Sequence, residues 1–159
     1  MVKKVVLGVF LGLIIGGILI QFIPYGHDHT NPAVAAEPRW DSQQTRDLVV
    51  RACYDCHSNQ TPWPWYSNIA PVSWLVQHDV QEGRARLNFS QWGTTRRGGD
   101  EAAQQIRQGN MPPSYYLLIH PTANLTSDEK QALVQGLQTS LSGGTKNGTQ
   151  SQERADLSN

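Results

Sequence analysis

Residues 53–57 read Cys-Tyr-Asp-Cys-His, and they contain both cysteines of the 159-residue chain. Two thiols three positions apart, followed at once by an imidazole, form the C-x-x-C-H pattern of c-type haem attachment. Thiols at this spacing can reach the two vinyl groups of one porphyrin, and the adjacent imidazole then lies under the iron. The motif therefore predicts one covalently attached haem c, held by Cys53 and Cys56, with His57 as an iron ligand.

Two other uses of a cysteine pair fit this sequence less well. A thioredoxin-like redox pair needs its first cysteine at a helix N-terminus, whereas this motif ends a helical pattern and follows no strand. A structural zinc site needs four ligands, and neither a second C-x-x-C nor an H-x₃₋₅-H pattern follows. With only two cysteines, a scaffold of several disulfides is excluded.

The second face of the iron has three candidate ligands in the sequence: Met111, His78 and His120. Met111 stands in Gly-Asn-Met-Pro-Pro, residues 109–113. The two prolines hold the backbone extended, so a rigid loop can present the thioether inward. Filling a gap in the core is the common alternative role of a methionine, but the only other methionine is Met1. We expect Met111 to be the distal ligand and the two histidines to lie at the surface or behind the ligands.

The sequence around the motif predicts an all-α domain over residues 39–141, because no segment alternates as a strand does. The first helix is expected from Asp41 or Ser42 to the cysteines. Its apolar face comprises Leu48, Val49 and Ala52. The second is expected from Pro71 to Gly83. Its inner face is predicted to comprise Val72, Leu75, Val76, Asp79 and Val80.

Two further helices are predicted in the second half of the domain. A short one begins at Asp100 and ends at Gly109. The last begins with a capping box, residues 126–129, which read Thr-Ser-Asp-Glu. Its apolar stripe is Leu133, Leu137 and Leu141.

The N-terminus predicts a membrane anchor over residues 1–23. Lys3 and Lys4 precede residues 5–23, which contain no charge. Nineteen helical residues are just long enough to cross a hydrocarbon core of roughly 30 Å. Lysines on the near side favour a cytoplasmic N-terminus, which places the rest of the chain on the periplasmic side of the inner membrane as a single-pass protein. The alternative is a signal peptide cleaved after the Ala-Val-Ala of residues 33–35, but the apolar run is longer than usual for a signal.

The segments on either side of the domain read as irregular. Residues 24–38 are rich in proline and alanine without periodicity, which predicts a tether. His27 and His29 lie in this tether, and we expect both to be solvated. Residues 142–159 are polar and rich in glycine, serine and threonine, which is typical of a disordered tail.

Composition narrows the function classes further. Thirteen basic and thirteen acidic residues balance, which argues against nucleic-acid binding through a basic surface. Outside the N-terminal apolar run the chain is poor in aliphatic residues, so the domain needs a staple such as a large apolar cofactor. Trp63, Trp65 and Tyr66 are expected to pack against the porphyrin. Four arginines are expected at the surface, with haem propionates as alternative partners: Arg84, Arg86, Arg96 and Arg97.

Two long stretches resemble a known family. Residues 53–92, CYDCHSNQTPWPWYSNIAPVSWLVQHDVQEGRARLNFSQW, and residues 111–137, MPPSYYLLIHPTANLTSDEKQALVQGL, are similar to the bacterial haem-binding domain family, a relative of the class I cytochromes c. The resemblance implies a cytochrome c-like helical domain around a single haem, with His57 as proximal and Met111 as distal ligand. Relatives fused to cytochrome c and dihaem peroxidase modules imply a redox setting. Residues 63–74 depart from ordinary class I cytochromes, so partner surfaces are not carried over.

These observations leave more than one function open. We expect a one-electron carrier rather than an enzyme, because His/Met ligation fills both axial positions. Its expected partners are redox proteins at the membrane and the haem maturation machinery. The alternative is a gas or redox sensor or a peroxidase-like enzyme with an exchangeable distal ligand, in which His78 or His120 would act as acid and base. A structural subunit folded around its haem is a third reading.

Overall fold

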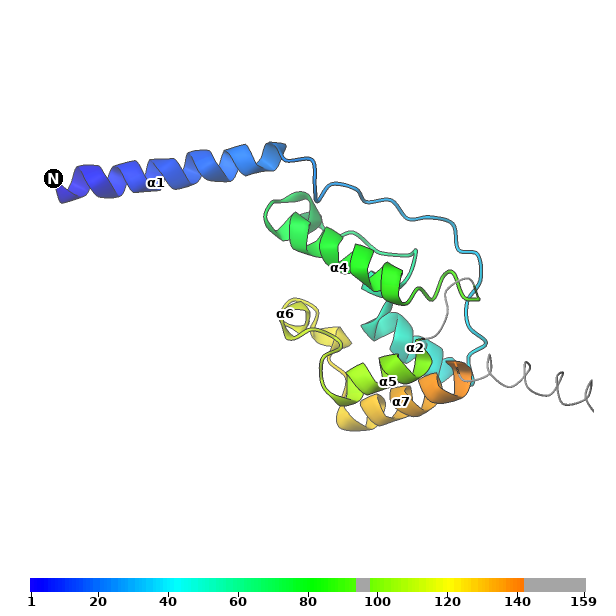
Figure 1. The fold of residues 1–159 in the computed structure, drawn as a ribbon. Helices are drawn as coiled ribbons and strands as arrows, with labels where there is room; N and C mark the ends of the chain where they lie inside the picture. Colours follow the sequence, from blue (N-terminus) through cyan, green and yellow to red (C-terminus); the bar gives the residue numbers. More distant parts are fainter. Residues whose placement is uncertain (94–97, 142–159) are drawn as a thin grey trace, which may run out of the picture.

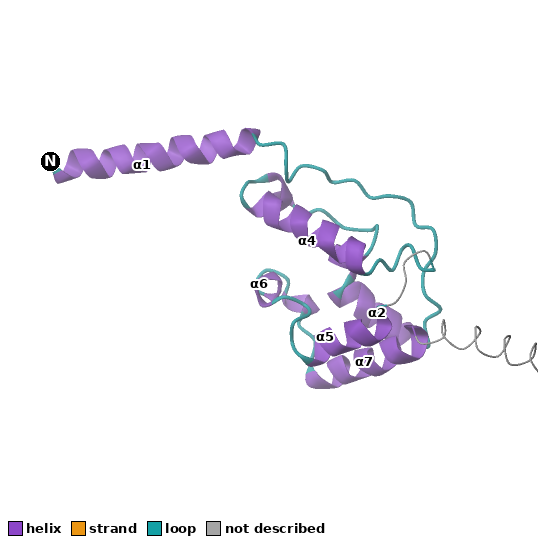
Figure 2. Ribbon diagram, viewed as in Figure 1, coloured by secondary structure: helices purple, strands orange, loops and turns teal. Residues whose placement is uncertain are grey.

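The computed structural model describes residues 1–93 and 98–141, and these residues form helices and loops without a strand (Figures 1 and 2). The all-α prediction is therefore confirmed. The helices, in chain order, are α1 (Val2–Leu19), η1 (Ile20–Phe22), α2 (Gln43–Ala52), α3 (Tyr54–His57), η2 (Trp65–Asn68), α4 (Val72–Arg86), α5 (Gly99–Arg107), α6 (Ser114–Leu117), η3 (Pro121–Ala123) and α7 (Ser127–Leu141). The domain boundaries stay predictions, and the predicted tail, residues 142–159, lies outside the described residues.

The N-terminal helix stands apart from the rest of the molecule. The apolar helical stretch Val2–Phe22 is long enough to cross a membrane, and none of it is buried against the domain. Figure 1 shows α1 extending away from the other helices. A helix that is apolar on every side and buries none of its side chains in the domain is suited to a bilayer.

Helices α2 and α7 begin as the sequence predicts. The Ser42 hydroxyl accepts a hydrogen bond from the backbone N–H of Thr45 at 3.1 Å, which caps α2. At α7, the Thr126 N–H donates to Glu129 Oε2 at 2.8 Å and the Glu129 N–H donates to Thr126 Oγ1 at 3.2 Å. This reciprocal pair is the predicted capping box.

The hydrophobic core lies between α2, α5 and α7, with one aromatic side chain from the loop after α4. Leu133 and Leu137 are buried, and Leu141 packs against them from the edge. Helix α5 starts before Asp100, with Gly98 as its N-cap, which corrects the predicted start. The buried core residues are Leu48, Val49, Ala52, Tyr54, Phe89, Ala103, Ile106, Leu125, Leu133, Val134 and Leu137. Helices α2, α5 and α7 also form one wall of the cavity described below.

Helix α4 differs from the prediction at its end and in its buried face. It continues through Gly83 to Arg86, and Val72 and Leu75 are exposed. The buried residues are Ser73, Gln77, Val80 and Gly83. Glycine stands at position 83, inside α4, because α4 and α3 approach each other closely there. A Cβ atom on Gly83 would stand 2.5 Å from the Cys56 carbonyl oxygen. Gly83 therefore serves packing and does not end the helix.

The predicted tether, residues 24–38, is extended along the domain rather than free of it (Figure 1). The Asp28 N–H donates to Gln77 Oε1 at 3.1 Å, and Asn59 Nδ2 donates to the Ala33 carbonyl at 2.9 Å. Hydrogen bonds made by the backbone, which need no apolar periodicity, attach this segment, and sequence patterns do not reveal them. We call residues 24–38 the strap.

Arg84 fastens the strap and is not the solvated arginine that we expected. Its Nε donates to the Ser58 carbonyl at 2.8 Å, and its Nη1 donates to the Thr30 carbonyl at 2.9 Å. Its Nη2 also donates to Asn31 Oδ1 at 2.7 Å. One guanidinium thus joins α4, the loop after the C-x-x-C-H motif and the strap.

The contact between Gly83 and Cys56 predicts that Gly83→Ala lowers the free energy of unfolding by about 1–3 kcal/mol, because the added methyl group overpacks the joint between α3 and α4. Urea unfolding followed by circular dichroism measures this change. Gln81→Ala, at an exposed position of the same helix, is the control and is expected to stay within about 0.5 kcal/mol. A stabilised Gly83→Ala protein, as helix propensity alone would give, contradicts the packing role.

Candidate functional site

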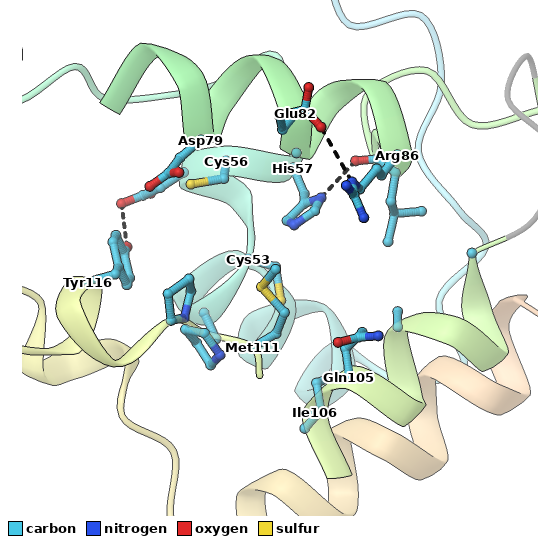
Figure 3. Close-up of a pocket in the computed structure, with 18 of the residues that line it drawn as sticks. Cys53, Cys56, His57, Asp79, Glu82, Arg86, Gln105, Ile106, Met111 and Tyr116 are labelled. Carbon is cyan, nitrogen blue, oxygen red and sulfur yellow. Dashed lines mark hydrogen bonds and ion pairs between the residues drawn. The ribbon is translucent and has the colours of Figure 1, made fainter. Parts of the chain in front are cut away.

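A cavity of about 410 Å³ opens between the two halves of the domain (Figure 3). Its walls come from the C-x-x-C-H motif, the C-terminal half of α4, one face of α5 and the loop before α6. Much of the lining is apolar and includes Ala52, Leu87, Phe89, Ala102, Ile106, Met111, Pro112, Pro113 and Leu137. Charged side chains also line it, at Asp55, Asp79, Glu82, Arg86 and Glu101. A concave site of this size with a mostly apolar surface is typical of cofactor binding.

The structure places both cysteines on this cavity. Cys53 follows the last residue of α2, and the short helix α3 turns Cys56 and His57 towards the same space. The His57 N–H donates to the Cys53 carbonyl at 2.8 Å, which closes the turn of the motif. Two thiols and one imidazole therefore face one cavity from a single turn of chain.

His57 is held with one ring nitrogen engaged and the other available. Its Nδ1 lies 2.9 Å from the Leu87 carbonyl oxygen, and because a carbonyl only accepts, Nδ1 carries the proton. Burial lowers the pKa of His57, which keeps the ring neutral at pH 7. A neutral imidazole with Nδ1–H bonded to a carbonyl leaves the Nε2 lone pair free, which is the form that binds a metal.

Met111 lines the same cavity from another part of the chain (Figure 3). Gly109, with φ at +73°, ends α5, and the Asn110 N–H donates to the Gln105 carbonyl at 3.0 Å. Pro113 is extended and begins α6. The loop is thus fixed at both ends, and the structure brings Met111 together with Cys53, Cys56 and His57.

The two candidate histidines lie in different places. His78 is exposed and borders the cavity. His120 does not line it and belongs instead to a second cavity of about 150 Å³, between η2, the first part of α4 and the segment after α6. There His120 Nε2 is hydrogen-bonded to the Tyr66 hydroxyl, and its ring stacks on Tyr116 at 4.1 Å.

Two tyrosines that sequence reasoning missed line both cavities. The Tyr115 hydroxyl donates to Asp79 Oδ2 at 3.0 Å, and the Tyr116 hydroxyl donates to Asp55 Oδ2 at 2.7 Å. Burial raises the pKa of Asp79 and that of Tyr115, the latter to about 12, so Tyr115 keeps its proton at neutral pH. The two tyrosines come one residue after the two prolines of residues 109–113, which we call the methionine loop, and this position could have indicated them in the sequence.

Trp63 and Trp65, which we expected to pack against a porphyrin, do not line the large cavity. Trp63 stacks on His29 of the strap at 4.5 Å, so His29 is not simply solvated, and Trp65 is 75% exposed. Tyr66 lines the second cavity only. The aromatic lining of the large cavity comes instead from Phe89 and the two tyrosines.

Of the two among the four arginines that the structure describes, Arg86 lines the large cavity and Arg84 does not. The Nε of Arg86 lies 3.5 Å from Glu82 Oε2 (Figure 3). Arg86 is exposed, and its ion pair with Glu82 is therefore in contact with solvent. Arg84 is committed to the strap, and Arg96 and Arg97 lie outside the described residues. A guanidinium at the mouth of an apolar cavity is suited to an acidic group of a bound cofactor.

The chemistry of the site fits an iron porphyrin better than the two rival uses of cysteine. Burial raises the pKa of both thiols to about 12, which opposes the thiolate that a redox pair or a zinc site requires. Across residues 1–93 and 98–141, no group of three or more histidine, cysteine, aspartate or glutamate side chains could hold a metal ion. A neutral imidazole, a thioether and an apolar wall suit a porphyrin with its iron.

Comparison with known proteins agrees with this chemistry. The sequence model of the family described as haem-binding domain matches residues 15–139, which include the strap, the motif and the methionine loop. No curated protein and no solved structure matches the chain. The family match spans well over half of the chain and all of the residues that line the cavity. The protein belongs to the haem-binding domain family.

Proposed function

We propose that this protein is a one-electron carrier with a single covalent haem c, anchored in the inner membrane with its haem domain on the periplasmic side. The observation that carries the proposal is the gathering of two thiols, one neutral imidazole and one thioether on a single cavity. The cofactor class follows from the family, and the covalent attachment, the ligands and the transfer of electrons are our inference.

Cys53 and Cys56 are the residues that would hold the porphyrin covalently. Both thiols face the cavity from one turn of chain, at the spacing that two vinyl groups require. Burial raises the pKa of both thiols, so they are protonated at neutral pH in the folded chain.

His57 and Met111 are the proposed axial ligands. His57 is fixed by its hydrogen bond to Leu87 and offers Nε2 to the cavity. Met111 approaches from the loop after α5, a different wall of the cavity. When bound, the haem iron supplies one-electron chemistry between its ferric and ferrous states. Thioether ligation favours the ferrous state, and two protein ligands leave no position for a substrate.

The anchor supports a carrier that works beside membrane proteins. Lys3 and Lys4 precede the apolar helix, which favours export of everything after it. Tethering raises the effective concentration of the domain near membrane partners, so a strongly charged docking surface is not needed. The balance of thirteen basic and thirteen acidic residues agrees with this mode of encounter.

Covalent attachment predicts that haem remains with the polypeptide after acid–acetone extraction when the protein is produced with a c-type maturation system. The double variant Cys53→Ser, Cys56→Ser should lose its haem in the same extraction, because no thioether can form. Mass spectrometry of the extracted chain provides the readout. Extraction of the haem from the unmodified protein would contradict covalent attachment.

Ligation by Met111 predicts that the reduced protein does not bind carbon monoxide, since both axial positions are filled. Met111→Ala should bind carbon monoxide and show a lower reduction potential, because the thioether is lost. His78→Ala and His120→Ala are the matched controls and should leave the visible spectrum and the potential nearly unchanged. Optical titration and potentiometry measure both properties.

Two outcomes would favour the alternative of a sensor or peroxidase-like enzyme. His78 lies at the edge of the cavity, where an acid or base would act on a ligand of the iron. Rapid carbon monoxide binding by the unmodified protein, or peroxide turnover that His78→Ala abolishes, would replace the carrier by that reading.

A further inference from the structure

Large apolar side chains are exposed at one end of the domain. Trp65 is 75% exposed and Leu118 is 83% exposed, and Ile69, Val72 and Ile119 are also exposed. We call these five residues the apolar end. On the surface of a soluble protein, exposed apolar side chains are normally scattered among charged ones. A cluster of exposed apolar side chains therefore marks a contact surface.

The apolar end comes from two segments that contact each other. Tyr66, next to Trp65, is hydrogen-bonded to His120, next to Ile119, and Val72 and Ile119 line the same second cavity. Neither segment carries an aspartate, glutamate, lysine or arginine from residue 56 to 77 or from residue 108 to 127. The cluster is therefore continuous across the two segments and uncharged in both.

The end of the membrane helix is fastened beside this cluster. Gln21 Nε2 donates to the Ala70 carbonyl at 3.0 Å, and Gln21 Oε1 accepts from the Ala70 N–H at 2.9 Å. Ala70 lies between Ile69 and Pro71, at the start of α4. One glutamine amide thus joins the last turn of the apolar helix to the segment that bears the apolar end.

The strap also packs closely on α4 at Gly26. A Cβ atom on Gly26 would stand 2.6 Å from Ser73 Oγ and 2.7 Å from Trp74 Cδ1, so the backbone of the strap packs directly on α4. Figure 1 shows α1 leading away from the end of the domain at which α4 and α6 lie. A bilayer crossed by α1 would meet this end of the domain first.

We propose that the apolar end docks on the surface of the bilayer that α1 crosses, with Trp65 and Leu118 in the interfacial region. The inference rests on the membrane anchoring proposed above. The occupant is lipid rather than a protein because the surface is continuous with the membrane helix, uncharged and rich in the tryptophan and aliphatic side chains that interfaces favour. Docking holds the haem domain in one orientation and turns the second cavity towards the membrane.

The test uses the full chain with its haem attached and reduced, labelled with 5-fluorotryptophan and reconstituted into phosphatidylcholine nanodiscs. A fraction of the lipids carries a gadolinium chelate on the headgroup, and fluorine NMR measures the added relaxation at each tryptophan. Trp65→Phe assigns the Trp65 signal. Trp40, which packs on Phe89, is the internal control. It precedes α2, which Figure 1 shows on the side of the domain away from α1.

The expected result is a relaxation enhancement several-fold larger for Trp65 than for Trp40. Leu118→Ser should reduce the Trp65 enhancement, whereas Val50→Ser, at an exposed apolar position of α2, should not. Equal enhancement of the two tryptophans in a chain that co-purifies with the nanodiscs overturns docking and leaves the anchor intact. A chain that does not co-purify with the nanodiscs overturns the anchor and the docking together.

Discussion

The hydrogen bond between His57 Nδ1 and the Leu87 carbonyl connects the two walls on which the site depends. It fixes the tautomer of the imidazole, and it ties the C-x-x-C-H motif to the residue that follows α4. The contact of Gly83 with the Cys56 carbonyl makes the same connection one turn earlier. Because α4 is held against the motif at two points, the cavity on the other side of His57 has a fixed wall.

The rest of the domain is arranged around that cavity rather than around a continuous core. Helices α2, α5 and α7, together with Tyr54 of α3, bury one apolar cluster, whereas α4 and η2 form a second body with few buried apolar side chains. The strap closes the second body from outside through backbone hydrogen bonds and the guanidinium of Arg84. A porphyrin in the cavity would complete a core that the side chains alone leave divided, as the aliphatic-poor composition requires.

Features set by local sequence were predictable. The Ser42 cap and the capping box of α7 depend on neighbouring residues only, and both occur as predicted. The motif and Met111 were identified by their residue types, and the fold brings them to one cavity. Contacts between distant segments were not predictable in this way. From the sequence, Gly83 is predicted to end a helix, and only the structure shows its close contact with Cys56. Likewise, Trp63 is predicted to pack on the cofactor, and only the structure shows that it stacks on His29 of the strap.

The pairing of His57 with Met111 is the central claim, and the chain contains only two methionines, Met1 and Met111. Carbon-13 labelling of the methionine methyl groups therefore gives two signals in the reduced holoprotein. A thioether bound to ferrous haem iron places its methyl group over the porphyrin ring, whose ring current shifts the proton resonance far upfield. The account predicts one methyl signal in that upfield region and one at an ordinary position. Two methyl signals at ordinary positions would contradict Met111 as the distal ligand.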